Sequence, residues 1–528
     1  MMYSILTLLT LLPLAFTLDS NTMRSRSVYQ VVTDRFALPN STASSTPCNV
    51  SNRQYCGGTW AGIQSKLDYI KGMGFDTIWI SPIVSNIGGT TGEGQSYHGY
   101  WSLDVSQLNS QFGTANDLQN LISAVHGNGM YIMVDVVINH VAATSSNTFS
   151  PSPAYGPFSA QDDFHPFCWI EDYSNQTQVE QCWLGDTNVA LPDLNTESAT
   201  VVDYWNTWIR NLTATYAIDA IRIDTVKHIR HDFWTNFTSS ANVFNQGEVL
   251  DGDATYVGDY QSNGSVNPFN YPVYYQLVQA FNGTTGSLAD LVSMTGQVKG
   301  NFSDPTLAGA FLNNHDNPRF ESYTNDAALI KNAHAYSLVG DGIPYVYYGS
   351  EAGFDGGNDP DNREPLWPSG YNTSSGMYQY FNSLNTARQA AANASSSFFT
   401  TQMNITTLSS SELLIAKPPL ISVLSNRGSS SSISSSLVIP SSSSGWSAQT
   451  TVIDAVSCST FTTDSSGNLP ISIEEDGVPR VLIDSSKKGS LCSNTAAVTT
   501  KPKSAAGRIE AEWGAVVLGA AGALLVGL

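Results

Sequence analysis

Short runs of apolar and β-branched residues recur along the chain from residue 28 to residue 348, and stretches with a helical pattern separate them. Such an alternation is typical of a parallel β-sheet that is covered by helices. We therefore predict an α/β fold, a (β/α)8 barrel of the TIM type. The strands that we expect are Val28–Val32, Thr77–Ile80, Tyr131–Ile138, Ala217–Ile223, Val243–Val249, Asn267–Tyr275, Ala308–Asn313 and Ile343–Tyr348.

One long segment departs from this alternation. Between His140 and about Asn195 the chain carries many aromatic residues and one cysteine pair but no clear helix. A loop of this length without structure of its own is uncommon in a compact domain. We therefore expect a small subdomain, at about 140–195, that is inserted after the third strand.

Beyond about Ala391 the pattern changes to short alternating strands with many serines between them, which predicts an antiparallel β-sandwich. The serine runs Ser429–Ser436 and Ser441–Ser444 suit either a glycosylated linker or loops of the sandwich. We favour the loops because Leu437–Ile439 interrupts the runs like a strand. We thus place the barrel at 18–390 and the sandwich at 391–493. The clearest strands expected there are Leu413–Ala416, Ile421–Leu424 and Val481–Ile483.

The two ends of the chain have the composition of targeting segments. An apolar run from Ile5 to Phe16 closes with a small-x-small pattern, which predicts a signal peptide at 1–17. The apolar run Gly514–Leu528 follows a polar spacer and three small residues, which is the order of a GPI-attachment signal. A tail-anchoring transmembrane helix is the alternative, but 15 residues fall short of the ~20 that a span needs. We expect a stalk at 494–504, a propeptide at 505–528, and a secreted protein that a GPI lipid holds at the outer face of the plasma membrane or in the cell wall.

Charge and cysteine content restrict the partners and the compartment. Lys and Arg total 23 against 44 Asp and Glu, and the net charge of −21 would repel nucleic acid and anionic lipid headgroups. We expect a monomer that binds a neutral or cationic partner and no nucleic acid. An even cysteine count in a secreted chain indicates disulfides rather than a metal site. The near-neighbour pairs are Cys48 with Cys56, Cys168 with Cys182, and Cys458 with Cys492. Sequons for N-glycosylation agree with a secretory route and occur at Asn40, Asn49, Asn175, Asn211, Asn236, Asn263, Asn282, Asn301, Asn372, Asn393 and Asn404.

Three acidic residues, Asp224, Glu248 and Asp316, lie at the expected ends of three strands. Because the parallel strands of a barrel all end at one face, the fold would gather these distant residues into one site. Carboxyl groups arranged in this way are what the cleavage of a glycosidic bond requires. The sequence therefore predicts a polysaccharide-cleaving site.

Side-chain alternation places Arg222 and Asp224 on one face of their strand and Ile221 and Ile223 on the other. In a barrel the apolar pair would meet the helices and the charged pair would face the axis. Arg222 would then favour the ionised form of Asp224, as a nucleophile needs. A structural ion pair is the alternative for an isolated Arg-x-Asp, but the two further acids at strand ends favour catalysis.

Glu248 and Asp316 would complete the site. Repulsion by neighbouring carboxylates should raise the pKa of Glu248 and keep this residue protonated as the general acid. Asp316 would orient the sugar and stabilise an oxocarbenium-like transition state. A nucleophile and an acid about 5 Å apart would retain the anomeric configuration.

Segments around these acids resemble the four signature segments of the α-amylase family of glycoside hydrolases, in the family's order. They are Asp135–His140, Arg222–His228, Glu248–Asp251 and Asn314–Asp316. Four more segments narrow the resemblance to the secreted fungal α-amylases of the Taka-amylase type, with a GPI signal added: Tyr97–Trp101, Cys182–Asp186, Leu191–Asp193 and Gly357–Arg363. The resemblance implies that Asp224 is the nucleophile, Glu248 the acid/base and Asp316 the transition-state stabiliser.

The resemblance also implies a set of substrate-binding side chains. Those expected around the glucose unit that is cleaved are His98, Tyr100, His140, Arg222, His315, Asp359 and Arg363. Those expected at neighbouring sugars are Trp101, Lys227 and His228. Aromatic rings suit glucose because its axial C–H bonds pack on a ring face. For any one of these histidines or aromatics alone, packing is the better explanation, so the assignment depends on the shared pattern.

A structural calcium ion is implied where the inserted subdomain meets the barrel. Asn139 and Asp193 would supply side-chain oxygens, and Glu180 and His228 would supply carbonyl oxygens. Ligation by oxygen alone suits Ca²⁺ rather than zinc. The alternative role for Asn139 is a strand-end cap.

Three functions fit these features. The first is an endo-acting α-1,4-glucan hydrolase that acts on starch, maltooligosaccharides or wall α-glucan. A 4-α-glucanotransferase would use the same carboxylates, but anchored fungal relatives of that kind tend to replace His140 or His315, and this chain has both. A glucan-binding or wall-structural protein on an inactive scaffold would usually lose a carboxylate, and all three are present here.

Overall fold

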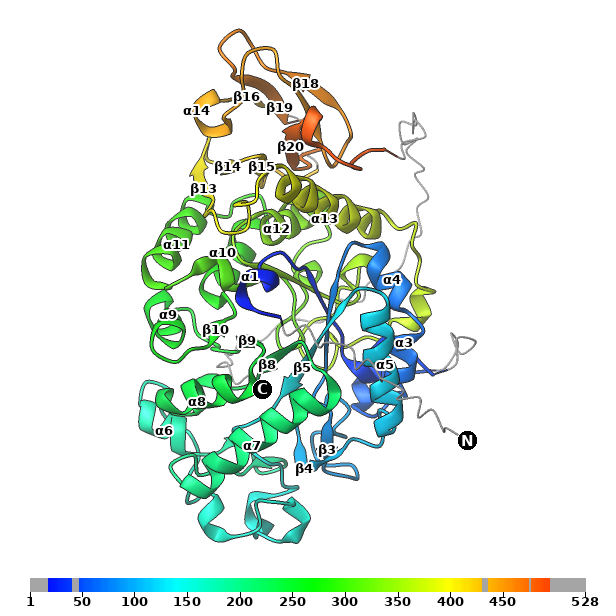
Figure 1. The fold of residues 1–528 in the computed structure, drawn as a ribbon, viewed down its shortest axis with the longest axis vertical. Coiled ribbons are helices and arrows are strands. Elements are labelled where there is room, and N and C mark those ends of the chain that lie inside the picture. Colours follow the sequence, from blue (N-terminus) through cyan, green and yellow to red (C-terminus); the bar gives the residue numbers. More distant parts are fainter. Residues whose placement is uncertain (1–17, 40–46, 430–434, 474–475, 494–528) are drawn as a thin grey trace, which may run out of the picture.

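The computed structural model describes residues 18–39, 47–429, 435–473 and 476–493 (Figure 1). Eight parallel strands form one sheet in the order β10-β9-β8-β5-β2-β1-β12-β11. The two edge strands meet where Phe269 and Gly309 form a parallel bridge, so the sheet closes into a barrel. This confirms the predicted (β/α)8 fold. The strands are β1 (Val28–Gln30), β2 (Thr77–Ile80), β5 (Tyr131–Val136), β8 (Ala220–Ile223), β9 (Phe244–Gly247), β10 (Asn267–Pro268), β11 (Gly309–Phe311) and β12 (Ile343–Tyr347).

Helices cover the outside of the barrel, and the apolar pattern of strands and helices explains why. Along β1, Val28 packs inside the barrel, whereas Tyr29 packs between the strands and the helices. The covering helices are α3 (Trp60–Gln64), α4 (Leu67–Gly72), α5 (Ala115–Gly127), α7 (Ala199–Tyr216), α8 (His231–Ala241), α9 (Ala254–Ser262), α10 (Tyr271–Phe281), α11 (Leu288–Asn301), α12 (Ala327–Val339) and α13 (Gly376–Ala394). Two short helices, α1 (Ser20–Met23) and α2 (Thr33–Phe36), flank β1.

The predicted sixth strand, Asn267–Tyr275, is wrong over most of its length. Only β10 is extended, and α10 begins at Tyr271. The side chain of Asn270 caps this helix by accepting a hydrogen bond from the Val273 N–H. Pro272 stands in the first turn, where its missing N–H is not needed. The aromatic and β-branched residues that follow β10 thus lie on the buried face of α10 and not in a strand.

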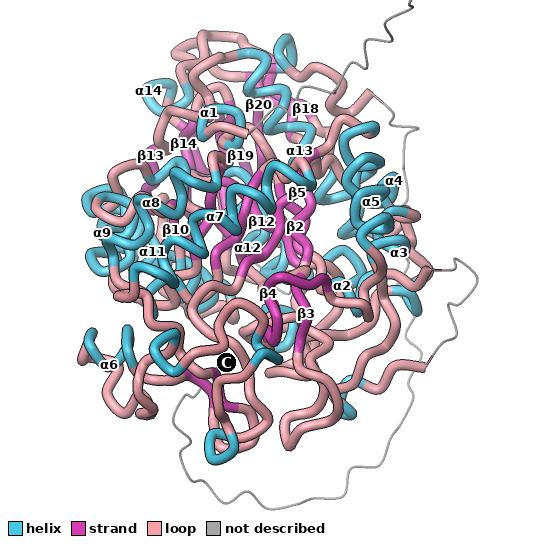
Figure 2. The backbone as a smooth tube through the Cα atoms, turned by 60° about the horizontal axis from the view of Figure 1, so that its bottom comes forward, coloured by secondary structure: helices cyan, strands magenta, loops and turns pink. Residues whose placement is uncertain are grey.

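The inserted subdomain lies at the end of the molecule opposite the C-terminal domain, as Figure 2 shows from below. It contains the two-stranded sheet of β6 (Leu184–Gly185) and β7 (Ala190–Leu191). It also contains a six-residue helix, α6 (Gln176–Gln181), where the sequence indicated no helix. Asn175 caps α6 by accepting from the Gln178 N–H, a short local signal that a search for hydrophobic periodicity misses. Nearby, β3 (Val84–Asn86) and β4 (Ser102–Leu108) form a hairpin.

The C-terminal domain is an antiparallel β-sandwich, as predicted. Its larger sheet has the order β13-β14-β15-β20-β17-β18, and β16 pairs with β19. Along β14, Leu413 and Ile415 face the barrel helices, whereas Leu414 and Ala416 pack against the smaller sheet. The strands are β13 (Asn404–Thr407), β14 (Glu412–Lys417), β15 (Leu420–Ser425), β16 (Ser435–Ile439), β17 (Thr451–Asp454), β18 (Thr460–Thr462), β19 (Leu469–Ile473) and β20 (Arg480–Asp484).

The serine-rich region belongs to this sandwich. Leu437–Ile439 lies in β16, as its pattern indicated, and part of the preceding run lies outside the described residues. Ser441–Ser444 is not a loop but a single helical turn, α14, which ends at Gly445 in the left-handed conformation. The linker alternative therefore does not hold for these residues.

All three expected disulfides are present, Cys48–Cys56, Cys168–Cys182 and Cys458–Cys492. Within the described ranges, no helix has the length and apolar character of a membrane span. The expected signal peptide, stalk and GPI propeptide lie outside the described residues, so these assignments stay predictions.

Candidate active site

The three expected acids meet at the carboxyl end of the barrel strands. Asp224 follows β8, Glu248 follows β9, and Asp316 lies in the segment after β11. Arg222 connects the first two, because its Nη1 lies 2.6 Å from Oδ1 of Asp224 and its Nη2 lies 3.2 Å from Oε2 of Glu248. As the alternation predicted, Ile221 packs outward while Arg222 points into the barrel.

A fourth carboxyl group, that of Asp135, belongs to the same cluster. Its Oδ1 lies 3.1 Å from Nη1 of Arg222, and its Oδ2 accepts hydrogen bonds from Tyr100 (2.6 Å) and Trp79 (3.1 Å). The sequence analysis missed this role, although Asp135 stands in a quoted segment. Side chains two residues apart on a strand point to the same face. Because Met133 packs inside the barrel, Asp135 on the same strand should also point inside, and this alternation could have indicated its role.

The electrostatics of the cluster are dominated by burial. Burial raises the pKa of Asp224, Glu248 and Asp316, and it raises that of Asp135 to about 7. Arg222 opposes the rise at all four carboxyl groups. Repulsion by Asp224 and Asp316 adds to the rise at Glu248, so the expected direction is right, but its largest cause is burial rather than repulsion. At Asp224, burial outweighs the expected effect of Arg222.

The segment that carries Asp316 is held by the side chain of Asn314 and by Arg363. Oδ1 of Asn314 accepts hydrogen bonds from the N–H groups of Asp316 (3.0 Å) and Asn317 (2.9 Å). Nη2 of Arg363 lies 3.6 Å from Oδ1 of Asp316, and its Nε donates to the carbonyl of His315 at 3.0 Å. The expected Arg363 and Asp316 are thus in one network.

Aromatic and histidine side chains line one side of the cluster. The rings of Tyr100 and His315 are stacked with centroids 5.0 Å apart, and His98 packs between Tyr100 and the edge of Trp101. Nε2 of His140 lies 3.3 Å from the Tyr100 carbonyl. Burial lowers the pKa of His140 to about 4 and brings those of His98 and His315 well below their usual range, so these rings are neutral.

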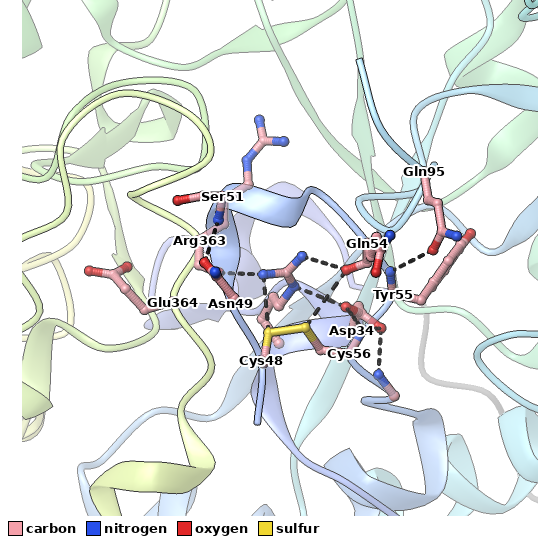
Figure 3. The surroundings of a disulfide bond; sticks show 12 residues. Asp34, Cys48, Asn49, Ser51, Gln54, Tyr55, Cys56, Gln95, Arg363 and Glu364 are labelled. Carbon is pink, nitrogen blue, oxygen red and sulfur yellow. Dashed lines mark hydrogen bonds and ion pairs between the residues drawn. A yellow bond between two sulfur atoms is a disulfide. The ribbon is translucent and has the colours of Figure 1, made fainter. Parts of the chain in front are cut away.

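Asp359 is clamped between two arginines, of which the sequence analysis identified one. Nη1 of Arg363 lies 3.0 Å from Oδ1 of Asp359, and Nη1 of Arg53 lies 2.9 Å from Oδ2. Arg53 belongs by its position in the sequence to the loop that the Cys48–Cys56 disulfide closes. Figure 3 shows this disulfide and its surroundings. Since the contact of Arg53 with Asp359 joins residues 306 positions apart, no local pattern in the sequence could indicate it.

The Cys48–Cys56 loop is fixed to the barrel by a buried ion pair on α2. The carboxylate of Asp34 accepts hydrogen bonds from the N–H groups of Cys56 and Gly57, as Figure 3 shows for Asp34 and Cys56. Arg35 donates to the carbonyl of Gln54 at 2.8 Å and to the carbonyl of Arg363 at 3.2 Å. The same arginine therefore positions both segments that hold Asp359.

Lys227 and His228 lie beside the cluster, on the side of α6. Lys227 donates to the Leu250 carbonyl at 2.8 Å and stands over the ring of Tyr173, which is 56% exposed. Nδ1 of His228 lies 3.0 Å from the Val179 carbonyl. An exposed ring beside a lysine can take a sugar face, which fits the expected place of neighbouring sugars.

Two of the four expected calcium ligands carry buried oxygens without a partner. Asn139 and Asp193 are each 1% exposed, and Oδ1 of each has no hydrogen-bond partner. An antiparallel bridge between His140 and Asp193 brings the two segments together. His165 contacts Oδ2 of Asp193 at 2.6 Å. Two orphaned buried oxygens fit an oxygen-binding cation.

The other two expected ligands are backbone carbonyls. The contact of His228 with the Val179 carbonyl places Glu180 and His228 on adjacent segments. Oε1 of Glu180 accepts a hydrogen bond from the side chain of Gln176 at 2.8 Å. No cluster of three acidic, histidine or cysteine side chains suited to a metal is found in the described part of the chain.

A cluster of carboxyl groups at the carboxyl ends of the strands of a (β/α)8 barrel has the arrangement that a glycoside hydrolase requires. Residues 30–412 match the family described as "Alpha amylase, catalytic domain", and residues 398–500 match "Alpha-amylase, domain C". The chain belongs to the α-amylase family of glycoside hydrolases.

Comparison with individual proteins agrees with this assignment. The chain is 52% identical to Alpha-amylase 1 of Lipomyces kononenkoae over 368 residues, which are 70% of this chain and 59% of that relative. It is 41% identical to Alpha-amylase 1 of Schwanniomyces occidentalis over 88% of this chain and 90% of that one. The solved structure of an α-amylase from Malbranchea cinnamomea, 39% identical, superimposes with a TM-score of 0.86 and covers 90% of this chain and 99% of that chain.

Proposed function

We propose that this protein is a secreted, endo-acting α-1,4-glucan hydrolase that retains the anomeric configuration. The observation that carries the proposal is the guanidinium of Arg222, which contacts the carboxyl groups of Asp224, Glu248 and Asp135. The names of the relatives, α-amylases of two yeasts, support an α-glucan as the substrate class.

The charge balance of the cluster supports separate roles for Asp224 and Glu248. The carboxyl groups of Asp135, Asp224, Glu248 and Asp316 face two guanidinium groups, those of Arg222 and Arg363. Buried like charges in excess retain protons. Between Asp224 and Glu248, a proton should favour Glu248, because its contact with Arg222 is the longer of the two.

The reaction then follows in two displacements. Asp224 attacks the anomeric carbon while Glu248 protonates the leaving oxygen, and Asp316 stabilises the positive charge that develops on the ring. In the second step Glu248, now ionised, takes a proton from water, and this water releases the sugar from Asp224. Neutral His98 and His315 can each donate one hydrogen bond to a sugar hydroxyl without adding positive charge beside the developing cation, whereas the proton of neutral His140 faces the Tyr100 carbonyl.

A 4-α-glucanotransferase is the second candidate, because it differs only in the acceptor of the glycosyl group. The exposed Tyr173 beside Lys227 offers a sugar-binding surface that would serve an acceptor sugar as well as a departing one. Incubation with maltopentaose and calcium separates the two functions. A hydrolase gives shorter products and new reducing ends. Products longer than maltopentaose at a constant number of reducing ends would overturn the hydrolase proposal, and an inactive Asp224→Asn variant serves as the control.

We further propose a structural calcium ion held by Asn139, Asp193 and the carbonyls of Glu180 and His228. The ion would supply a fixed positive charge that ties the inserted subdomain to the barrel, and it takes no part in the chemical steps. The orphaned Oδ1 atoms of Asn139 and Asp193 support this site.

Secretion and anchoring are proposed from the sequence of the two ends. The apolar segment 5–16 and the tail 514–528 support a signal peptide and GPI attachment, respectively. A phosphatidylinositol-specific phospholipase should release the protein from the surface of cells that express the full chain. A chain ending at Ser504 should instead appear in the medium. Retention after the lipase treatment would contradict GPI attachment.

A further inference from the structure

Gln30, the last residue of β1, is an amide at a barrel-interior position where its neighbour Val28 is apolar. Its side chain is 3% exposed. Its amide nitrogen lies 2.8 Å from Nδ1 of His315, which is equally buried. A buried amide on the second nitrogen of a histidine at the substrate site can determine which of the two nitrogens carries the proton.

The other contacts of His315 leave one consistent protonation state. Its Nε2 lies 3.4 Å from Oδ2 of Asp316, and an ionised carboxylate can only accept a hydrogen bond. Burial lowers the pKa of His315, and Arg222 and Arg363 lower it further, so the ring is neutral and carries a single proton. The proton is therefore on Nε2, from which it can be donated to Asp316 or to the substrate. Nδ1 is then an acceptor and needs a donor.

We propose that Gln30 is a positioning residue that donates its amide N–H to Nδ1 of His315 and so keeps the His315 proton on Nε2, towards Asp316 and the sugar. This inference rests on the proposed glycoside hydrolysis and adds a residue to it. The orientation of the ring is fixed independently, by the stacked ring of Tyr100 and by the nearly perpendicular ring of Trp79, whose centroid lies 6.0 Å from that of His315. What Gln30 contributes is therefore the position of the proton rather than the position of the ring.

Two substitutions separate these contributions. Gln30→Met keeps the length of the side chain and removes the donor, so both neutral forms of His315 become populated. Gln30→Glu places an acceptor at Nδ1 and draws the proton to that nitrogen. Because the wrong form turns a lone pair towards Asp316, we expect kcat on maltopentaose to fall about tenfold in Gln30→Met and further in Gln30→Glu. KM should change less than threefold in both variants.

The matched control is Gln246→Met. Gln246 is a second amide inside the barrel, fully buried on β9, where its partners are the Tyr345 hydroxyl and the Asn267 carbonyl. It has no contact with His315 among the interactions of the described residues. The control therefore reproduces the loss of a buried amide without touching the proton on His315.

The deciding measurement is the ¹⁵N NMR spectrum of the histidine rings in the full-length enzyme, with the His315 signals assigned by a His315→Asn variant. The wild type should show a protonated Nε2 and an unprotonated Nδ1, and Gln30→Met should show averaged shifts. A protonated Nδ1 in the wild type would overturn the proposal. So would an equal shift in Gln246→Met, which would indicate general loosening of the barrel. The spectrum does not depend on turnover, so a failure of the hydrolase proposal would appear only in the maltopentaose assay.

Discussion

Nη1 of Arg53 lies 2.9 Å from Oδ2 of Asp359. This contact joins the loop closed by Cys48 and Cys56 to the segment after β12 that also carries Arg363. Asp359 in turn reaches Asp316 through Arg363. A surface loop thus extends the charge network of the active site to the rim of the barrel.

Replacing Arg53 by Gln should weaken substrate binding more than turnover. The side chain of Arg53 is 32% exposed, so solvent screens its ion pair and limits the pair to about 1 kcal/mol. We expect KM for maltooligosaccharides to rise roughly two- to fivefold, while kcat stays within about twofold, since about 1.4 kcal/mol corresponds to a factor of ten and the pair contributes about 1 kcal/mol. Initial rates on substrates of increasing length test this expectation.

Arg230→Gln is the control for Arg53→Gln. Arg230 pairs with Asp232 at the surface and has no contact with Asp359. If both variants changed KM equally, the effect would be one of net charge and not of the Arg53–Asp359 contact.

The barrel could be predicted from the sequence because each strand carries its own apolar run. The expected sixth strand, Asn267–Tyr275, is the exception. Tyr271 and Tyr274 have strand-like side chains, but the capping residue Asn270 and the proline at 272 decide in favour of a helix. Local hydrogen bonding thus overrides side-chain propensity, as happens often in short segments.

The site could be predicted only where a segment carries several functional residues in a fixed order, as around Asp224 and Asp316. Arg53 and Gln30 act through contacts between distant segments. The contact of Gln30 with His315 spans 285 positions, and nothing near Gln30 in the sequence indicates its partner. The roles of such residues can be identified only in the folded barrel, where the strand ends lie close together.

Calcium removal should lower the thermal stability of the wild type. An ion that binds only the folded state stabilises it by about 2.7 kcal/mol at a hundredfold excess over Kd. We expect EDTA to lower the Tm by several degrees and added CaCl₂ to restore it. In Asp193→Ala and Asn139→Ala the Tm should no longer respond to either. A calorimetric scan in which Asp193→Ala responds like the wild type would contradict the proposed ligand set.

Replacing Asp34 by Asn should strongly destabilise the protein. Asp34 and Arg35 are both fully buried, and their side chains meet at 2.9 Å. Loss of the carboxylate charge leaves the Arg35 charge buried and uncompensated, which costs about 3–5 kcal/mol. Thermal unfolding in the presence of calcium measures the loss. The pair Arg230–Asp232 provides the comparison: the Asp232 side chain is 75% exposed, so Asp232→Asn should change stability by less than about 1 kcal/mol.

The contact of His126 with Asp219 should make stability depend on pH in a defined direction. Nε2 of His126, near the end of α5, lies 2.8 Å from Oδ2 of Asp219, and this hydrogen bond raises the pKa of His126 while burial partly opposes the rise. Folding therefore favours the protonated ring. The resulting stabilisation is fully present below the ordinary histidine pKa of about 6.5 and is lost as the pH rises through the higher pKa of the folded state.

His126→Gln removes the ionisable ring. Comparison of this variant with the wild type therefore isolates the part of the pH dependence of stability that is due to His126. The side chain of His126 is 35% exposed, so screening limits the contribution to less than about 1 kcal/mol. We expect the difference in free energy of unfolding between wild type and His126→Gln to be larger at pH 5.5 than at pH 9. Urea unfolding at both pH values, with calcium held constant, measures it. A difference that stays the same, or that grows towards pH 9, would show that the charged form of His126 does not stabilise the fold.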